Sequence, residues 1–167
     1  MNGNGAAELA VSGLLPDGTV RINIKDASTG DWIRVNFFPA SPAPKAFGTL
    51  ADLNGNGAVE QIILGILPSG LVRINIKDSA TGDWVGAKFF PANPPPMAIN
   101  TVSDMNGNGV DELAVLGILP DRSVRVNIKD AATGDWVGAK YLPADPVPIS
   151  FATIPDVNGN GNDELAV

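Results

Sequence analysis

The sequence predicts an all-β protein made of β-propeller blades, each blade a four-stranded antiparallel sheet. The first observation behind this prediction is repetition, because the tetrapeptide Asn-Gly-Asn-Gly begins at Asn2, Asn54, Asn106 and Asn158, a constant step of 52 residues. The second is the short spacing of β-prone runs between turn residues, with no helical period in any copy. Such units stack because one alone cannot bury its apolar face, and four short strands per unit are typical of a propeller blade.

The chain is expected to form a single repeat domain over 1–167. Residues 1–52, 53–104 and 105–156 are complete copies, and 157–167 restates the opening as a partial fourth copy. A hydrophobic content of 44% in 167 residues predicts a folded domain with a sizeable core rather than a disordered chain.

The first two strands of a unit flank the Asn-Gly loop. A proline-rich segment such as 39–44 is expected to be extended polyproline II and to cross from the outer strand of one unit to the inner strand of the next. The β-prone run 97–103 leads into a loop and is predicted to be such an inner strand. The run 112–119 follows that loop, ends at Pro120, and is predicted to be the second strand.

The last two strands of a unit form a hairpin. Strict alternation of apolar and polar residues over 20–25 predicts the third strand, and 32–38 is predicted to be the fourth. Between them, Gly30 and its copies Gly82 and Gly134 stand where a three-residue hairpin loop requires a positive φ.

The Asn-Gly loop carries oxygen-bearing side chains at fixed offsets. Positions 1, 3, 5 and 9 hold Asp, Asn, Asn and Glu, and the glycine at position 6 lets a tight loop wrap one ion. Calcium takes six to eight oxygen ligands, and the main-chain carbonyl at position 7 would add one, as in EF-hand-type loops. The predicted Ca²⁺ ligands are Asp52, Asn54, Asn56, Ala58 and Glu60; Asp104, Asn106, Asn108, Val110 and Glu112; and Asp156, Asn158, Asn160, Asn162 and Glu164.

Two interpretations of this loop stay open. Asn and Gly dominate tight turns, so the loop is either a calcium site or an Asx turn that needs no ion. Turn chemistry does not account for Asp and Glu paired at fixed offsets, which favours calcium. The first copy predicts only an incomplete site, with Asn2, Asn4 and Glu8, because Met1 leaves no residue for position 1.

At these residues the sequence resembles the FG-GAP and VCBS repeat family, the blades of integrin α-subunit propellers and of many bacterial secreted or surface proteins. The family pattern, Asp-x-Asn-Gly-Asp-Gly-x-x-Asp-Leu-Ala-Val, is matched by residues 156–167, except that Asn160 and Glu164 each replace an Asp. The resemblance implies a propeller whose loops bind calcium and whose role is adhesion or ligand binding outside the cell. With these replacements each site has two formal negative charges, which predicts a weak Kd, on the order of 10⁻⁴–10⁻³ M.

Composition excludes several function classes. A formal charge of −7 argues against a nucleic-acid partner, which needs a basic surface, and suits cations better. The chain has no Cys for a thiolate metal site and no His for general-base catalysis. The longest apolar run, 62–67, is far short of a membrane span, and Met1 lies inside the repeat motif, which leaves no signal peptide expected in this chain.

Other recurring residues have two interpretations each. Trp32, Trp84 and Trp136 are either a ring of sugar-stacking platforms or, as we expect, rings packed between neighbouring sheets. The recurring Arg and Lys of the third strand are expected to form a solvated or inter-sheet polar face, represented by Arg73 and Lys77.

Three classes of function follow. The first is a non-catalytic, calcium-stabilised propeller that recognises a carbohydrate or protein; the alternatives are a structural spacer or fragment of a longer array, and a carbohydrate-active enzyme. An enzyme is not expected, because the carboxylates recur in every copy whereas catalytic sites are asymmetric.

Three units are too few for a propeller of four to eight blades. Two chains are therefore hypothesised to close a six-bladed ring as a homodimer, with 149–154 of one chain completing the sheet that begins at 7–14 of the other.

Overall fold

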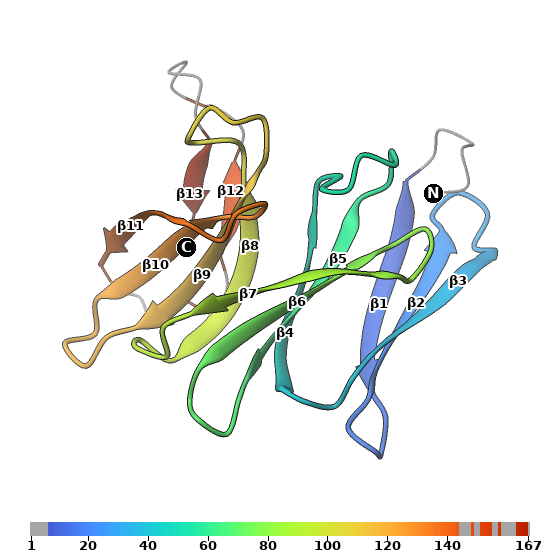
Figure 1. The fold of residues 1–167 in the computed structure, drawn as a ribbon, viewed down its shortest axis with the longest axis horizontal. Coiled ribbons are helices and arrows are strands. Elements are labelled where there is room, and N and C mark those ends of the chain that lie inside the picture. Colours follow the sequence, from blue (N-terminus) through green and yellow to red (C-terminus); the bar gives the residue numbers. More distant parts are fainter. Residues whose placement is uncertain (1–6, 144–147, 149–150, 155–156, 158–162, 167) are drawn as a thin grey trace.

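The computed structural model describes residues 7–143, 148, 151–154, 157 and 163–166. These residues form thirteen β-strands (Figure 1). No helix long and apolar enough to cross a membrane occurs among them. The strands are β1 (Glu8–Leu14), β2 (Val20–Asp26), β3 (Trp32–Phe38), β4 (Ala43–Leu50), β5 (Glu60–Ile66), β6 (Val72–Asp78), β7 (Trp84–Phe90), β8 (Pro96–Val102), β9 (Glu112–Ile118), β10 (Val124–Asp130), β11 (Trp136–Leu142), β12 (Ala152–Ile154) and β13 (Glu164–Ala166).

The strands form repeated antiparallel sheets in which consecutive strands are neighbours. Two sheets have four strands, β4-β5-β6-β7 and β8-β9-β10-β11, while the first sheet has three, β1-β2-β3, and β12 pairs with β13. The all-β class and the repeated four-stranded sheet are thus confirmed. The predicted strands 97–103, 112–119, 20–25 and 32–38 correspond to β8, β9, β2 and β3, with bounds that agree within one residue.

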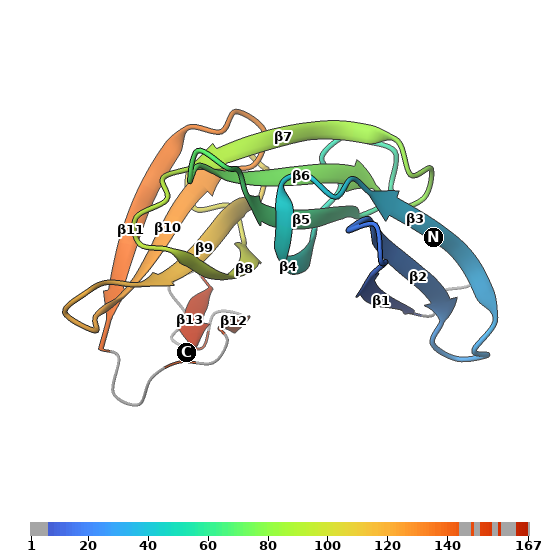
Figure 2. The same cartoon turned by 90° about the horizontal axis from the view of Figure 1, so that it is seen from below.

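The sheets follow one another along an arc. Figure 2 shows β3, β7 and β11 on its outer side and the strands at the other end of each sheet towards its inner side. The inner strands β4 and β8 of neighbouring sheets contact one another. Each loop between a first and a second strand therefore lies in an equivalent place in its own sheet.

The apolar core lies between neighbouring sheets. Ile62, Leu64, Ile74 and Ile76 of the second sheet are fully buried, and they pack in one cluster with residues of the third sheet such as Leu113. Burial on both faces explains why β5 and β9 are nearly continuous apolar runs rather than alternating ones.

The hairpin between the third and fourth strands is confirmed in each sheet. Gly30, Gly82 and Gly134 have φ of 77°, 80° and 82°, in the left-handed region that glycine adopts without steric cost. The polyproline II prediction for 39–44 is wrong in part. The Ser41–Pro42 peptide bond is cis, and β4 already begins at Ala43, so the crossing segment is shorter than expected.

The tryptophans do not fill the space between sheets, and this expectation is wrong. Trp32, Trp84 and Trp136 are each about half exposed. The guanidinium of Arg73 lies 5.5 Å from the Trp84 ring centre and 5.9 Å from that of Phe89. A long basic side chain of the same sheet thus covers each ring, and this is Lys25 for Trp32, Arg73 for Trp84 and Arg125 for Trp136. Lys77 instead reaches the neighbouring sheet, where its ammonium lies 5.6 Å from the ring centre of Phe38.

Candidate functional site

The loop between β4 and β5 folds around the carboxylate of Asp52. One carboxylate oxygen accepts the main-chain N–H groups of Gly55 at 2.7 Å and Asn56 at 3.2 Å, and the other accepts that of Gly57 at 2.6 Å. Gly55 and Gly57 have positive φ, at 80° and 84°, which allows the chain to turn back on Asp52 twice. These hydrogen bonds, that of Gly57 foremost, lower the pKa of Asp52.

The two asparagines of the loop bond in two directions. Their Oδ1 atoms accept main-chain N–H groups inside the loop, Asn54 from Asn56 at 3.1 Å and Asn56 from Ala58 at 2.8 Å. Their Nδ2 groups donate to Oδ2 of Asp78, at 3.0 Å from Asn54 and 2.6 Å from Asn56. The side chains of positions 3 and 5 therefore tie the loop to the end of β6.

Asp78 is a site residue that the sequence analysis missed. It is the last residue of β6, is almost fully buried, and has copies in Asp26 and Asp130 at the ends of the other third strands. Burial alone would raise its pKa, but hydrogen bonds from the Asn54 side chain, the Thr81 main chain and the Asn56 side chain outweigh burial and lower the pKa of Asp78 to about 2. The signal that could have found it is the recurrence of this Asp 24 residues after the position-3 Asn.

Glu60, at position 9, brings a third carboxylate to the loop. It is the first residue of β5 and is fully buried, and its Oε2 accepts the main-chain N–H of Leu53 at 2.9 Å. Its Oε1 is buried and has no hydrogen-bond partner in the part of the chain that is described. Burial, and then the negative charges of Asp52 and Asp78, raise the pKa of Glu60.

The loop between β8 and β9 repeats this arrangement, and Figure 1 shows both loops at the same end of their sheets. Oε1 of Glu112 is again buried without a hydrogen-bond partner among the described residues. Burial alone would raise the pKa of Asp130, but hydrogen bonds from Thr133, Asn106 and Asn108 outweigh burial and lower the pKa to about 2. The Asp104 carboxylate accepts the main-chain N–H groups of Gly107 (2.6 Å), Asn108 (3.1 Å) and Gly109 (2.6 Å). The Asp130 carboxylate accepts the side-chain amides of Asn106 (2.9 Å) and Asn108 (2.5 Å). Asn108 Oδ1 accepts the main-chain N–H of Val110 (2.8 Å), and Glu112 accepts that of Met105 (2.8 Å).

The other predicted sites are described only in part. In the third loop, Glu164 Oε2 accepts the main-chain N–H of Val157 at 2.8 Å, as the glutamates of the first two loops do. Asp156, Asn158, Asn160 and Asn162 lie outside the described residues, and so do Asn2 and Asn4 of the incomplete first copy.

The donor set of these loops suits a hard cation. Among the described residues, no three side chains of His, Cys, Asp or Glu form a ready-made metal cluster, so an ion would also need the amide oxygens and a main-chain carbonyl. Those oxygens have capacity, because each Asn Oδ1 has two lone pairs and accepts one N–H in the loop. The Oε1 atoms of Glu60 and Glu112, which have no hydrogen-bond partner in the described part of the chain, would be further ligand positions for such an ion. The same hydrogen bonds also hold the loop as an Asx turn, so both interpretations remain.

No model of a known protein family matches the chain. No functionally characterised protein matches it either. The support for a function therefore comes from the geometry of the loops themselves.

Proposed function

We propose that this chain is a non-catalytic, calcium-binding β-propeller repeat module of the FG-GAP and VCBS type, which serves adhesion or ligand recognition outside the cell. The observation that carries the proposal is the buried Oε1 of Glu60, which has no hydrogen-bond partner among the described residues, and its repetition at Glu112. In each loop this atom belongs to a glutamate whose pKa is raised by burial and by the negative charges of two neighbouring aspartates.

A buried carboxylate oxygen without a partner is costly in the folded protein. Leaving such a group unsatisfied costs on the order of 1–3 kcal/mol, and more when it is charged. Around Glu60 the charges of Asp52 and Asp78 add repulsion. A bound divalent cation would neutralise these charges and give the free oxygen a partner.

The residues that would hold calcium are the predicted ones. They are Asp52, Asn54, Asn56, the main-chain carbonyl of Ala58, and Glu60, with Asp104, Asn106, Asn108, Val110 and Glu112 in the next sheet. When bound, calcium would supply positive charge that joins the loop to the first residue of the following strand. Asp78 and Asp130 would orient the ligands without contacting the ion, because each accepts hydrogen bonds from the side-chain amides of the two asparagines in its loop.

The recognition role is supported by the exposed aromatic surface. Trp84 and Phe89 of β7 are each about half exposed and are bridged by the Arg73 guanidinium. Trp136, Tyr141 and Arg125 repeat the arrangement in the next sheet. Aromatic and arginine side chains of this kind are enriched where proteins bind ligands, and aromatic faces stack on flat apolar ones. A carbohydrate or protein is the partner that we propose.

A calorimetric calcium titration of chelator-treated protein tests the metal site. We expect binding with a Kd on the order of 10⁻⁴–10⁻³ M for wild type, and loss of binding at the two described loops in Asp52→Asn/Asp104→Asn. The matched control is Asp17→Asn/Asp121→Asn, since these aspartates also cap exposed turns through main-chain N–H groups at 2.9 Å, outside the loops. Absence of calcium binding in wild type would contradict the proposal and favour a structural spacer whose loops are hydrogen-bonded turns.

The recognition role needs a separate experiment. A glycan-array screen with and without chelator is expected to show binding that calcium strengthens. Loss of that binding in Trp84→Ala/Trp136→Ala would place it on the exposed aromatic surface, and unchanged binding would contradict that placement.

A further inference from the structure

The first sheet presents an open strand edge. In the second and third sheets, β5 and β9 lie between an inner strand and a third strand, whereas β1 pairs only with β2 in the described part of the chain. Leu9 and Val11 of β1 are 58% and 63% exposed, while the residues at the same positions in β5, Gln61 and Ile63, are buried. An apolar strand with an unpaired edge is a site where another strand adds.

Gly13 indicates that β1 can accept an inner strand beside it. A Cβ atom on Gly65 of β5 would lie 2.8 Å from atoms of Pro42, and one on Gly117 of β9 would lie 2.5 Å from the Pro95 carbonyl. The glycine therefore makes room for the proline-rich segment that leads into the inner strand. Gly13 holds the same position in β1, yet none of the described atoms lies within 4 Å of its Cβ position.

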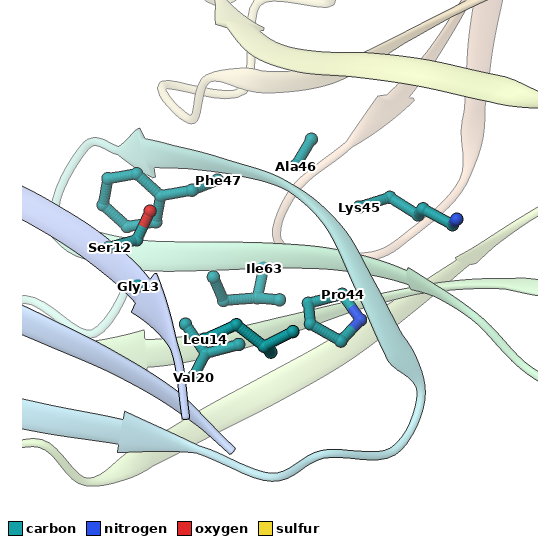
Figure 3. A pocket seen from close by; sticks show the side chains of 9 residues that line it. All are labelled: Ser12, Gly13, Leu14, Val20, Pro44, Lys45, Ala46, Phe47 and Ile63. Atoms are coloured by element: carbon teal, nitrogen blue, oxygen red, sulfur yellow. The ribbon is translucent and has the colours of Figure 1, made fainter. Parts of the chain in front are cut away.

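A cavity marks the same place. It has a volume of about 240 Å³ and lies between β1 and β4, with Gly13 and Leu14 on one side and Pro44 and Phe47 on the other (Figure 3). Because the inner strands β4 and β8 contact one another, an inner strand of the first sheet would contact β4 from this cavity.

The described residues include one inner strand beyond those that complete the two four-stranded sheets. β4 and β8 complete the second and third sheets, and β12 is the third inner strand. Among the described residues it pairs with β13 from Ala152 to Ile154, and β4 pairs with β5 from Ala43 to Leu50. β13 has the sequence Glu-Leu-Ala, with which β1 also begins, so β12 can pair with β1 in the register that it has with β13.

We propose that β12 of one copy of the chain leaves β13 and pairs with β1 of a second copy, reciprocally, in a closed dimer of six four-stranded sheets. In the register of the other sheets, Ile154 lies opposite Glu8 of the second copy and Thr153 opposite Leu9, with Pro148 against Gly13. The gain is cover for the exposed apolar side chains of β1, Leu9 and Val11. This goes beyond the proposed calcium site, because the strand exchange involves no loop ligand.

Light scattering of two glycine variants tests the exchange. We expect wild type to have twice the 17.2 kDa mass of one chain, in calcium and in chelator alike. Gly13→Val is expected to be a folded monomer, because its Cβ has no described atom of the same chain within 4 Å but would take the place of the partner's proline segment. The matched control, Gly86→Val, also has nothing within 4 Å of its Cβ position but lies on the outer strand β7, and it is expected to stay dimeric.

Engineered cysteines test the register independently, since the chain has no cysteine of its own. Leu9→Cys/Thr153→Cys is expected to form a disulfide-linked dimer under oxidation. Leu9→Cys/Thr101→Cys is the control and is expected to stay unlinked, because Thr101 is the same position in β8, which already pairs with β9. A monomeric wild type, a mass above two chains, a dimeric Gly13→Val, or equal cross-linking of the two cysteine pairs would each overturn the proposal. If Gly13→Val does not fold, the cysteine pairs decide.

Discussion

At the scale of single residues, substitutions at the hairpin glycines can distinguish the cost of backbone strain from the cost of a steric clash. Gly30 and Gly82 have nearly the same positive φ, but a Cβ on Gly82 would lie 2.9 Å from Oδ1 of Asn36, whereas one on Gly30 meets nothing within 4 Å. We expect Gly30→Val to lower the free energy of unfolding by about 1–2 kcal/mol from backbone strain, and Gly82→Val to lower it further. Urea unfolding measures both losses of stability, and equal losses would contradict the expectation that Asn36 crowds a side chain at position 82.

The buried aspartates behind the loops predict an acid-sensitive fold. The pKa of Asp78 is lowered from 3.8 to about 2, so its stabilising contribution is complete above the ordinary Asp pKa and is lost as pH falls from about 4 to about 2. Glu60 has the opposite sign, since its raised pKa means that the folded state gains stability when it is protonated. In chelator, Asp78→Asn is therefore expected to be less stable than wild type at neutral pH and to lose less stability on acidification. Parallel acid unfolding curves would contradict this.

Local spacing was enough to predict one half of the loop and not the other. Asp52, Asn54, Asn56 and Glu60 lie within nine residues, so their offsets alone brought them together, and the structure places them in one loop. Asp78 joins them only because β5 and β6 pair, which puts the ends of two strands side by side. A contact of that range depends on sheet register, which local spacing does not contain.

At the scale of strands and sheets, neighbouring sheets are joined by polar ties as well as by the apolar core. Asn36 of β3 is buried, and its Nδ2 donates to Gln61 Oε1 of β5 at 2.9 Å and to the Ser79 carbonyl at 3.2 Å. In the next sheet the same position is Lys88, whose ammonium donates to the Ala132 carbonyl. The first and second sheets are therefore fixed to one another by a buried amide.

Removing this tie on one side leaves buried groups unsatisfied. Asn36→Ala is expected to lower the free energy of unfolding by about 1–3 kcal/mol, because Gln61 Oε1 loses its partner inside the protein. Asn36→Leu/Gln61→Leu, which removes both partners, is expected to cost less. Chemical denaturation of both variants measures the difference, and a double variant less stable than the single one would show that the tie does not act in this way.

The strands themselves were predictable because each is a short β-prone run bounded by turn residues. The half-exposed tryptophans were not, because their surroundings depend on whether the Arg of the neighbouring strand folds over the ring, as Arg73 and Arg125 do. Nor was the start of β4 at Ala43, because its pairing with β5 extends a strand into residues whose own sequence favours polyproline II.

At the scale of the whole molecule, the arc of sheets places the loops in equivalent positions along the protein (Figure 2). Both described loops, 52–60 and 104–112, join an inner strand to a second strand and are held by the end of a third strand, so an ion bound there would brace three strands of one sheet. Because this bracing exists only in the folded state, calcium is expected to stabilise the entire fold rather than a single turn.

A thermal melt in millimolar calcium against EDTA tests this claim most directly. At a tenfold excess over Kd, which about 10 mM calcium reaches for the weakest expected Kd, each occupied site adds about 1.4 kcal/mol. For a chain of this length, that raises Tm by roughly 3–6 °C per site. The account predicts that wild type and Asp17→Asn/Asp121→Asn show this rise, and that Asp52→Asn/Asp104→Asn loses most of it. A midpoint that is the same in calcium and in EDTA would contradict the account.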